Sequence, residues 1–241
     1  MHMVQALLAG IRSRSRSLLW LIAFVPLLFV AARCIDNETL YQDSTGDWHI
    51  VGEMHNETDI QGAGMVLSGT LFDGADNVLG TAQVAACPME LSPHSFIGFD
   101  LHFQYAGAKP ARYEVRAVKG RALEQALPSS GLSLEEFEAA SAADGIHISG
   151  TVTSTRTYTG ILTGCAAVYN SAGRVITHFT LVNFGLNRPL TAGDAQPVAF
   201  TLPEFLVEPG ATTVRLWLAG DSATPFESDY AFVMTDSIPI Q

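Results

Sequence analysis

The chain has 241 residues, of which 48% are hydrophobic and 15% are charged, and this composition favours a folded protein over a disordered one. The first 33 residues carry four arginines and no acid, so the remainder holds 9 basic and 24 acidic side chains and a net charge of −15. A surface of that sign repels phosphate backbones and anionic lipids, which excludes nucleic acid as an expected partner.

The N-terminus has the features of an export signal. Residues 1–17 are basic and polar, and the 15 residues Leu18–Ala32 are apolar. A membrane-spanning helix needs about 20 residues, so the apolar run fits the hydrophobic region of a signal peptide that is cleaved after Ala32. Residues 1–33 are therefore predicted to be a signal peptide, and an uncleaved membrane anchor is the alternative.

The three cysteines offer one lipidation site and one disulfide. Cys34 directly follows the apolar run, where a lipoprotein carries its lipidated cysteine, although Arg33 stands where a lipobox has a small residue. A lipid on Cys34 would tether the chain to the membrane. Cys87 and Cys165 are expected either to form a disulfide in an oxidising compartment or to remain as two thiols.

A pattern of short strands occurs twice, about a hundred residues apart. Apolar and polar side chains alternate over residues 48–55 and again over residues 146–153, which indicates strands with one buried face. Matching strand, turn and strand segments follow in both copies, and the offset between the copies changes only in turns. We predict an all-β protein of two tandem immunoglobulin-like antiparallel β-sandwiches, at residues 47–118 and 146–241.

Residues 119–145 are predicted to be a linker that contains a short helix. Ser133 is followed three residues later by Glu136, which is the spacing of a capping box at a helix N-terminus. We expect the helix to run from about Leu134 to Ala143 and to end at Asp144 and Gly145.

The first repeat resembles a known family. The features that carry this are Gly52-Glu53 with Asn56, the segment GTLFDGADNVLG, and a Leu-Ser-Pro element that leads into the strand of Phe99. Together they resemble the FxLYD-type family of small immunoglobulin-like domains in exported or membrane-anchored prokaryotic proteins. Leu71-Phe72-Asp73 stands where that family has Leu-Tyr-Asp, and Gly69 stands where it has Phe. In the second repeat the looser match is Val168-Tyr169-Asn170. The resemblance implies architecture and location, with no attached activity.

Two groups of side chains could in principle hold a metal. His49, Glu53 and His55 share the polar face of one strand, but alternate residues on a strand are about 7 Å apart, so a solvated face is the favoured interpretation. Asp73, Asp76 and Asn77 are a weak calcium candidate, because the same residue types also form tight turns.

No sequence motif for a nucleophile, a phosphate loop or a dinucleotide site occurs, and we predict no catalytic residue, no cofactor and no enzymatic activity. Trp217 falls on the face opposite Val214 and Leu216, so it is either packed or an exposed contact point. The expected function is a non-catalytic binding, spacer or assembly module of a bacterial cell envelope with protein partners. The alternatives are a membrane-anchored accessory subunit of a larger envelope complex and a hydrolase with a site between the two repeats.

Overall fold

Antiparallel strands make up the part of the chain that the computed structural model describes, namely residues 34–88, 90–105, 107–158, 161–182, 184, 186, 188–203, 210–222 and 232–241. The strands in chain order are β1 (Ile35–Gln42), β2 (Trp48–Asn56), β3 (Gly62–Phe72), β4 (Val78–Ala85), β5 (Ser95–Phe103), β6 (Arg112–Ala122), β7 (Leu132–Ala142), β8 (Gly145–Ser154), β9 (Ile161–Asn170), β10 (Val175–Val182), β11 (Ala195–Pro203), β12 (Ala211–Ser222), β13 (Val233–Met234) and β14 (Ile238–Pro239). The prediction of an all-β protein is confirmed.

The predicted signal peptide or anchor of residues 1–33 lies outside the described residues. Within the described ranges, no helix has the length and apolar character needed to cross a membrane. Residues Ile35–Gln241 form one compact unit.

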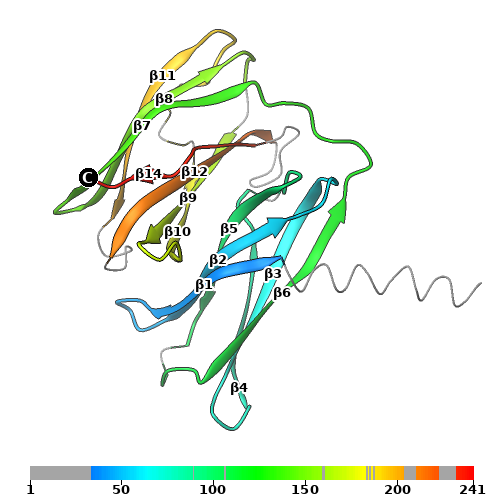
Figure 1. The fold of residues 1–241 in the computed structure, drawn as a ribbon, viewed down its shortest axis with the longest axis vertical. Helices are drawn as coiled ribbons and strands as arrows, with labels where there is room; N and C mark the ends of the chain where they lie inside the picture. The colour runs from blue at the N-terminus through cyan, green and yellow to red at the C-terminus, as the bar shows by residue number, and fades with distance from the viewer. Residues whose placement is uncertain are drawn as a thin grey trace, which may run out of the picture. The chain divides into compact units, whose positions relative to one another are not determined.

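Residues 35–122 form a first β-sandwich. One sheet has the order β1-β2-β5 and the other has the order β4-β3-β6, as can be followed in Figure 1. Apolar side chains at alternate positions of the two sheets meet between them: Gly69 of β3 lies so close to Leu101 and Phe103 of β5 that a Cβ atom there would come within 2.9 Å of both side chains. The core side chains Leu67, Leu101 and Phe103 are buried.

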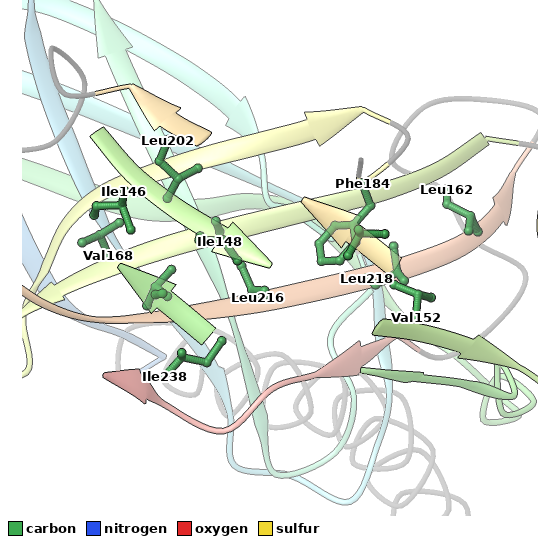
Figure 2. Close-up of a cluster of buried hydrophobic side chains, with 14 of the residues drawn as sticks. Ile146, Ile148, Val152, Leu162, Val168, Phe184, Leu202, Leu216, Leu218 and Ile238 are labelled. Carbon is green, nitrogen blue, oxygen red and sulfur yellow. The ribbon is translucent and has the colours of Figure 1, made fainter. Parts of the chain in front are cut away.

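Residues 132–241 form the second sandwich. Its sheets have the orders β11-β8-β7 and β10-β9-β12, and the C-terminal strands β13 and β14 add to the free edge of β12. Figure 2 shows the core between them, with Ile148 from one sheet near Leu216 from the other. Ile148, Val168 and Leu216 are at most 1% exposed, so this sandwich has a closed hydrophobic core.

The two sandwiches are the same structure used twice, down to the residue register. Gly69 pairs with Val115 between β3 and β6, and Val168 pairs with Val214 at the equivalent place between β9 and β12. In the other sheet, Ile50 pairs with Leu101 and Ile148 pairs with Phe200. An offset of 98 or 99 residues relates each of these positions to its counterpart, so the repeat is a duplication of a six-stranded unit.

The predicted linker helix is wrong, because residues Leu132–Ala142 are strand β7. The register between β7 and β8 shifts between Glu135 and Glu138, as at a β-bulge, and Glu136 has a positive φ of 53°. An inserted residue changes the apolar spacing from two to three, and this imitates the period of a helix. The same shift occurs in β1 at Asn37, whose φ is 57°.

The β-bulges also explain why both sandwiches were predicted to begin too late in the chain. The first sandwich begins with β1 at residue 35 and not at 47, and the second begins with β7 at residue 132 and not at 146. Both omitted strands contain the bulge, so neither shows the alternation that marks an unbroken strand.

The prediction of one buried face per strand was wrong for the two inner sheets. β10 packs against β1, β2 and β5, so the sheet β10-β9-β12 of the second sandwich contacts the sheet β1-β2-β5 of the first. Both faces of β2 are therefore covered, and Val51, which lies on the face predicted to be solvated, is 0% exposed. The contact between these sheets is called the interface below.

Candidate functional site: the interface between the two sandwiches

The centre of the interface is apolar and fully buried. It is a cluster separate from the core of the second sandwich, and it consists of Val51, Cys87, Cys165, Ala167, Tyr169, Val175 and Trp217. Members of this cluster come from both repeats, so its burial couples the two sandwiches.

A disulfide crosses this centre. Cys87 follows β4, Cys165 lies in the middle of β9, and their Cα atoms are 6.0 Å apart at a sequence separation of 78. Of the two outcomes expected from the sequence, the structure has the disulfide. Both cysteines are at most 2% exposed, so the bond is covered by the packing around it.

Glu53 of β2 is a buried carboxylate that binds across the interface. Its oxygens accept hydrogen bonds from the Tyr169 hydroxyl at 2.7 Å, from His55 Nε2 at 3.0 Å and from Asn37 Nδ2 at 2.5 Å. Burial acts to raise the pKa of Glu53, but these hydrogen bonds outweigh it and the net pKa is lowered. Burial and the Glu53 charge raise the pKa of Tyr169, so its hydroxyl remains a donor.

The Tyr169→Phe substitution is expected to lower the free energy of unfolding by about 2 kcal/mol, because it removes one of three hydrogen bonds from a buried charge. Chemical denaturation at neutral pH measures this. Tyr113→Phe is the matched control, since no hydrogen bond of the Tyr113 hydroxyl occurs among the described residues, and its effect should stay below about 0.5 kcal/mol. Equal effects of the two substitutions would contradict a role for Glu53 in joining the sandwiches.

Trp217 of β12 packs against Phe96 of the first sandwich at the interface. Its indole Nε1 donates to the Phe96 carbonyl oxygen at 3.0 Å, and its ring meets the Phe96 ring edge-on at 5.8 Å between centroids. The Arg215 guanidinium lies 4.9 Å from the centroid of the same Phe96 ring. Trp217 is 0% exposed, so it is a packing residue and not an exposed contact point.

Two histidines of the first sandwich, His49 and His102, are paired across β2 and β5 and stack on one another. His49 Nδ1 lies 2.8 Å from Asp100 and its Nε2 lies 3.5 Å from Asp43, while its ring stacks on those of Tyr41 and His102. Burial acts to lower the pKa of His49, but the two carboxylates outweigh it and the net pKa is raised. The set is therefore held by ion pairs between β2, β5 and the loop after β1.

His178 of β10 is a buried titratable group that forms no ion pair with another described residue. Its ring lies directly over Gly98 of β5, where even a Cβ atom would overlap it, and its buried Nε2 atom has no hydrogen-bond partner among the described residues. Burial lowers the pKa of His178 to about 4, although the charge of Asp100 acts in the opposite direction. The imidazole is thus neutral at physiological pH.

We expect His178 to make the fold sensitive to acid. In the unfolded chain this side chain binds its proton below about pH 6.5, but in the folded chain only below about pH 4, so between those values protonation favours unfolding. The contribution is about 3 kcal/mol lost between pH 7 and pH 4. Denaturation curves over this range should show a shallower pH dependence for His178→Gln than for the unsubstituted chain.

His147→Gln is the control for this pH experiment, because His147 has a half-exposed side chain in β8 and pairs with Asp144 away from the interface. Its pH dependence should match that of the unsubstituted chain. A His178→Gln chain that loses stability as steeply as the unsubstituted chain would show that other groups carry the acid sensitivity.

The two metal candidates are not assembled as metal sites. His49 is paired with aspartates, whereas Glu53 and His55 bind each other, so the three side chains do not converge. In the described ranges, no group of three or more His, Cys, Asp or Glu side chains could hold a metal ion.

The weak calcium candidate is a turn. Asp73 accepts hydrogen bonds from the backbone N–H groups of Ala75 and Asn77 and from the Asn77 side chain. Asp76 has a positive φ of 63° and pairs with Arg112 at 2.7 Å. The oxygen atoms of Asp73 and Asp76 are thus engaged in turn geometry and an ion pair.

Cys34, the lipidation candidate, stands one residue before β1 and is half-buried. A lipid on Cys34 would therefore be attached directly before the first strand of the fold. The lipidation of Cys34 remains a prediction.

No family model matches the chain, and a search of curated proteins finds no relative. A glycosyl hydrolase family 2 member from Bacteroides cellulosilyticus aligns with a TM-score of 0.30 at 6% identity, over 78% of this chain and 28% of that one. Red sea bream transglutaminase aligns with a TM-score of 0.26 at 11% identity, over 88% and 32%. A β-glucuronidase 2 from Bacteroides uniformis aligns with a TM-score of 0.27 at 12% identity, over 81% and 26%. This chain spans less than a third of each of these proteins, and likeness at these TM-scores carries no argument about activity.

Proposed function

We propose that the protein is a non-catalytic, extracytoplasmic binding and assembly module of a bacterial cell envelope, with the two immunoglobulin-like sandwiches held together as one spacer. The observation that carries the proposal is the Cys87–Cys165 disulfide inside the interface. Disulfides persist in oxidising compartments and are rare in the cytoplasm. The basic and apolar N-terminal segment of residues 1–33 supports the same location.

The contacts of the polar side chains at the interface support a structural role for these side chains. Glu53 binds Tyr169 across it, and Trp217 and the disulfide fill its centre. A hydrolase would need a nucleophile and a base that converge on an open cleft. The Glu53 carboxylate, the Tyr169 hydroxyl and the Trp217 indole are instead engaged in hydrogen bonds within the interface, so a role in holding two sandwiches together accounts for them without a substrate.

The resemblance of residues 47–118 to FxLYD-type domains supports this proposal from a separate direction. That family consists of small immunoglobulin-like domains of exported or membrane-anchored proteins. Leu71 and Phe72 end strand β3, which is central in its sheet between β4 and β6, and Asp73 accepts the hydrogen bonds of the turn that follows, so the triplet that carries the resemblance lies in a structural position.

The proposal is tested by isolating the protein from its native envelope and determining its intact mass and N-terminal sequence. A start at Arg33 or Cys34 indicates export with cleavage, and a start at Met1 in the membrane fraction indicates the anchored alternative. Cys87 and Cys165 should resist alkylation in denaturant until a reductant is added. Recovery from the cytoplasm, with both cysteines open to alkylation, would refute the extracytoplasmic role.

A further inference from the structure

The second repeat shows that one edge of this duplicated unit accepts an added strand. Strand β12 pairs with β9 on one side and with β13 and β14 on the other. Leu216 of β12 donates its N–H to Thr235 Oγ1 at 3.0 Å, and its carbonyl accepts the Thr235 N–H at 3.0 Å. Among the described residues, the equivalent strand β6 pairs only with β3. The edge of β6 is therefore open where the edge of β12 is occupied.

The open edge leaves apolar side chains of β6 partly uncovered. Val214 and Leu216 of β12 are 0% exposed, whereas the equivalent Val115 and Ala117 of β6 are only half-buried. The neighbouring Val118, at a register shift in β6, is 43% exposed. An added strand would remove this apolar surface from water, as the C-terminal strands do on β12.

The charge around β6 is opposite to that of the rest of the molecule. Of the 9 basic side chains beyond residue 33, five lie between Lys109 and Arg121. Arg112 pairs with Asp76 and Glu114. The exposed side chains of Arg116, Lys119 and Arg121 form no ion pair with another described residue.

A partner docked at β6 would respond to these basic side chains more than to the acidic remainder of the protein. Charges are screened over about 8 Å at physiological ionic strength, so the positive charge next to β6 determines which partners are attracted to this edge. A free strand edge that carries basic side chains fits an extended segment with acidic side chains better than it fits a nucleic acid or a folded surface, because it offers backbone pairing as well as charge.

We infer that the β6 edge binds an extended, acidic segment of a partner protein, which adds to the sheet as an antiparallel strand beside Arg116, Lys119 and Arg121. The inference names a partner class for the proposed binding role and rests on that role. Lys and Arg side chains on an edge strand can also have the opposite role, which is to prevent pairing with another chain. Binding of a peptide probe distinguishes a binding edge from a protected edge.

The probe is a fluorescent ten-residue peptide of alternating glutamate and valine, titrated with the full-length purified protein and followed by anisotropy. The test variant is Arg116→Glu with Lys119→Glu. Arg156→Glu with Arg174→Glu is the control, because it makes the same change in net charge at exposed positions outside β6. Thermal melting establishes that both variants are folded. We expect the β6 variant to bind about tenfold more weakly and the control to bind unchanged.

Two further peptides test the mode of binding. The same peptide N-methylated at every amide keeps its charges but cannot pair with an edge, so it should not bind. A peptide with lysine in place of glutamate should not bind either. Equal binding of the N-methylated peptide, or equal weakening by both protein variants, would overturn the inference in favour of nonspecific charge.

Other outcomes separate this inference from the proposed function. If the peptide does not bind to the unsubstituted chain, the basic side chains only prevent pairing at the β6 edge, and the inference is overturned. Concentration-dependent dimers that the β6 variant abolishes would make a second copy the occupant, which also overturns the inference. Cross-linking in intact cells can compare the envelope proteins bound by the unsubstituted chain with those bound by the β6 variant. If both chains capture the same proteins equally, the inference about β6 fails while the proposed binding role stands.

Discussion

Replacing Cys87 and Cys165 together by alanine is expected to lower the free energy of unfolding by about 4 kcal/mol. The disulfide closes a loop of 78 residues, and the chain-entropy argument gives a stabilisation of this size for a loop of that length. Typical domains have only about 5–15 kcal/mol of stability, so the variant should be marginal at 37 °C. Denaturant unfolding followed by circular dichroism measures the difference.

The control for this variant is Cys34→Ala, which leaves the disulfide intact and should change the free energy of unfolding by less than about 0.5 kcal/mol. The double variant should also lose part of its cooperativity. The disulfide and the cluster around it hold together two sandwiches that otherwise bury separate residues, such as Leu67 in the first and Leu216 in the second. A double variant as stable as the control would mean that the other interface contacts suffice to couple the sandwiches.

The duplication was predictable from the sequence because most of its strands alternate. Residues 48–55 and 146–153 show period two, and the structure places them in the equivalent strands β2 and β8. Turn residues such as Asp73 and Asn170 separate the next strands in both copies, where their side chains accept hydrogen bonds from the turn backbone. Local patterns of this kind are determined by the strand itself and need no knowledge of its neighbours.

The first strand of each repeat was not predictable by the same rule. An extra residue at Asn37 in β1 and at Glu136 in β7 takes up a left-handed conformation and moves every following side chain to the other face. In β7 the resulting spacing coincided with a capping-box pattern. The equivalence of the two bulges is visible only after the strands are paired.

The interface was not predictable because alternation does not reveal what covers a polar face. Glu53 and His49 look like solvated side chains in sequence, yet Glu53 is 3% exposed against Tyr169. A signal was nevertheless present in the second repeat. Cys165-Ala-Ala-Val168 has no polar residue, and a short continuous apolar run is typical of a strand buried on both faces.

The Trp217→Ala substitution is expected to lower the free energy of unfolding by about 4 kcal/mol, because it empties a fully buried site at the centre of the interface. The indole is 0% exposed and packs with Val51 and Tyr169 in a cluster built from both repeats. Truncation of a buried tryptophan costs about 3–5 kcal/mol through lost transfer energy and the cavity that remains. The loss of its hydrogen bond to the Phe96 carbonyl is part of this effect.

Trp217→Phe separates packing from hydrogen bonding at this site. It keeps an aromatic ring beside Phe96 but removes the indole N–H, so the expected loss is about 1–2 kcal/mol, clearly smaller than for alanine. Chemical denaturation of both variants distinguishes the two contributions. If both variants unfolded like the unsubstituted chain, Trp217 would not be packed between the sandwiches, and the coupling on which the proposed spacer role depends would rest on the disulfide and the Glu53–Tyr169 hydrogen bond.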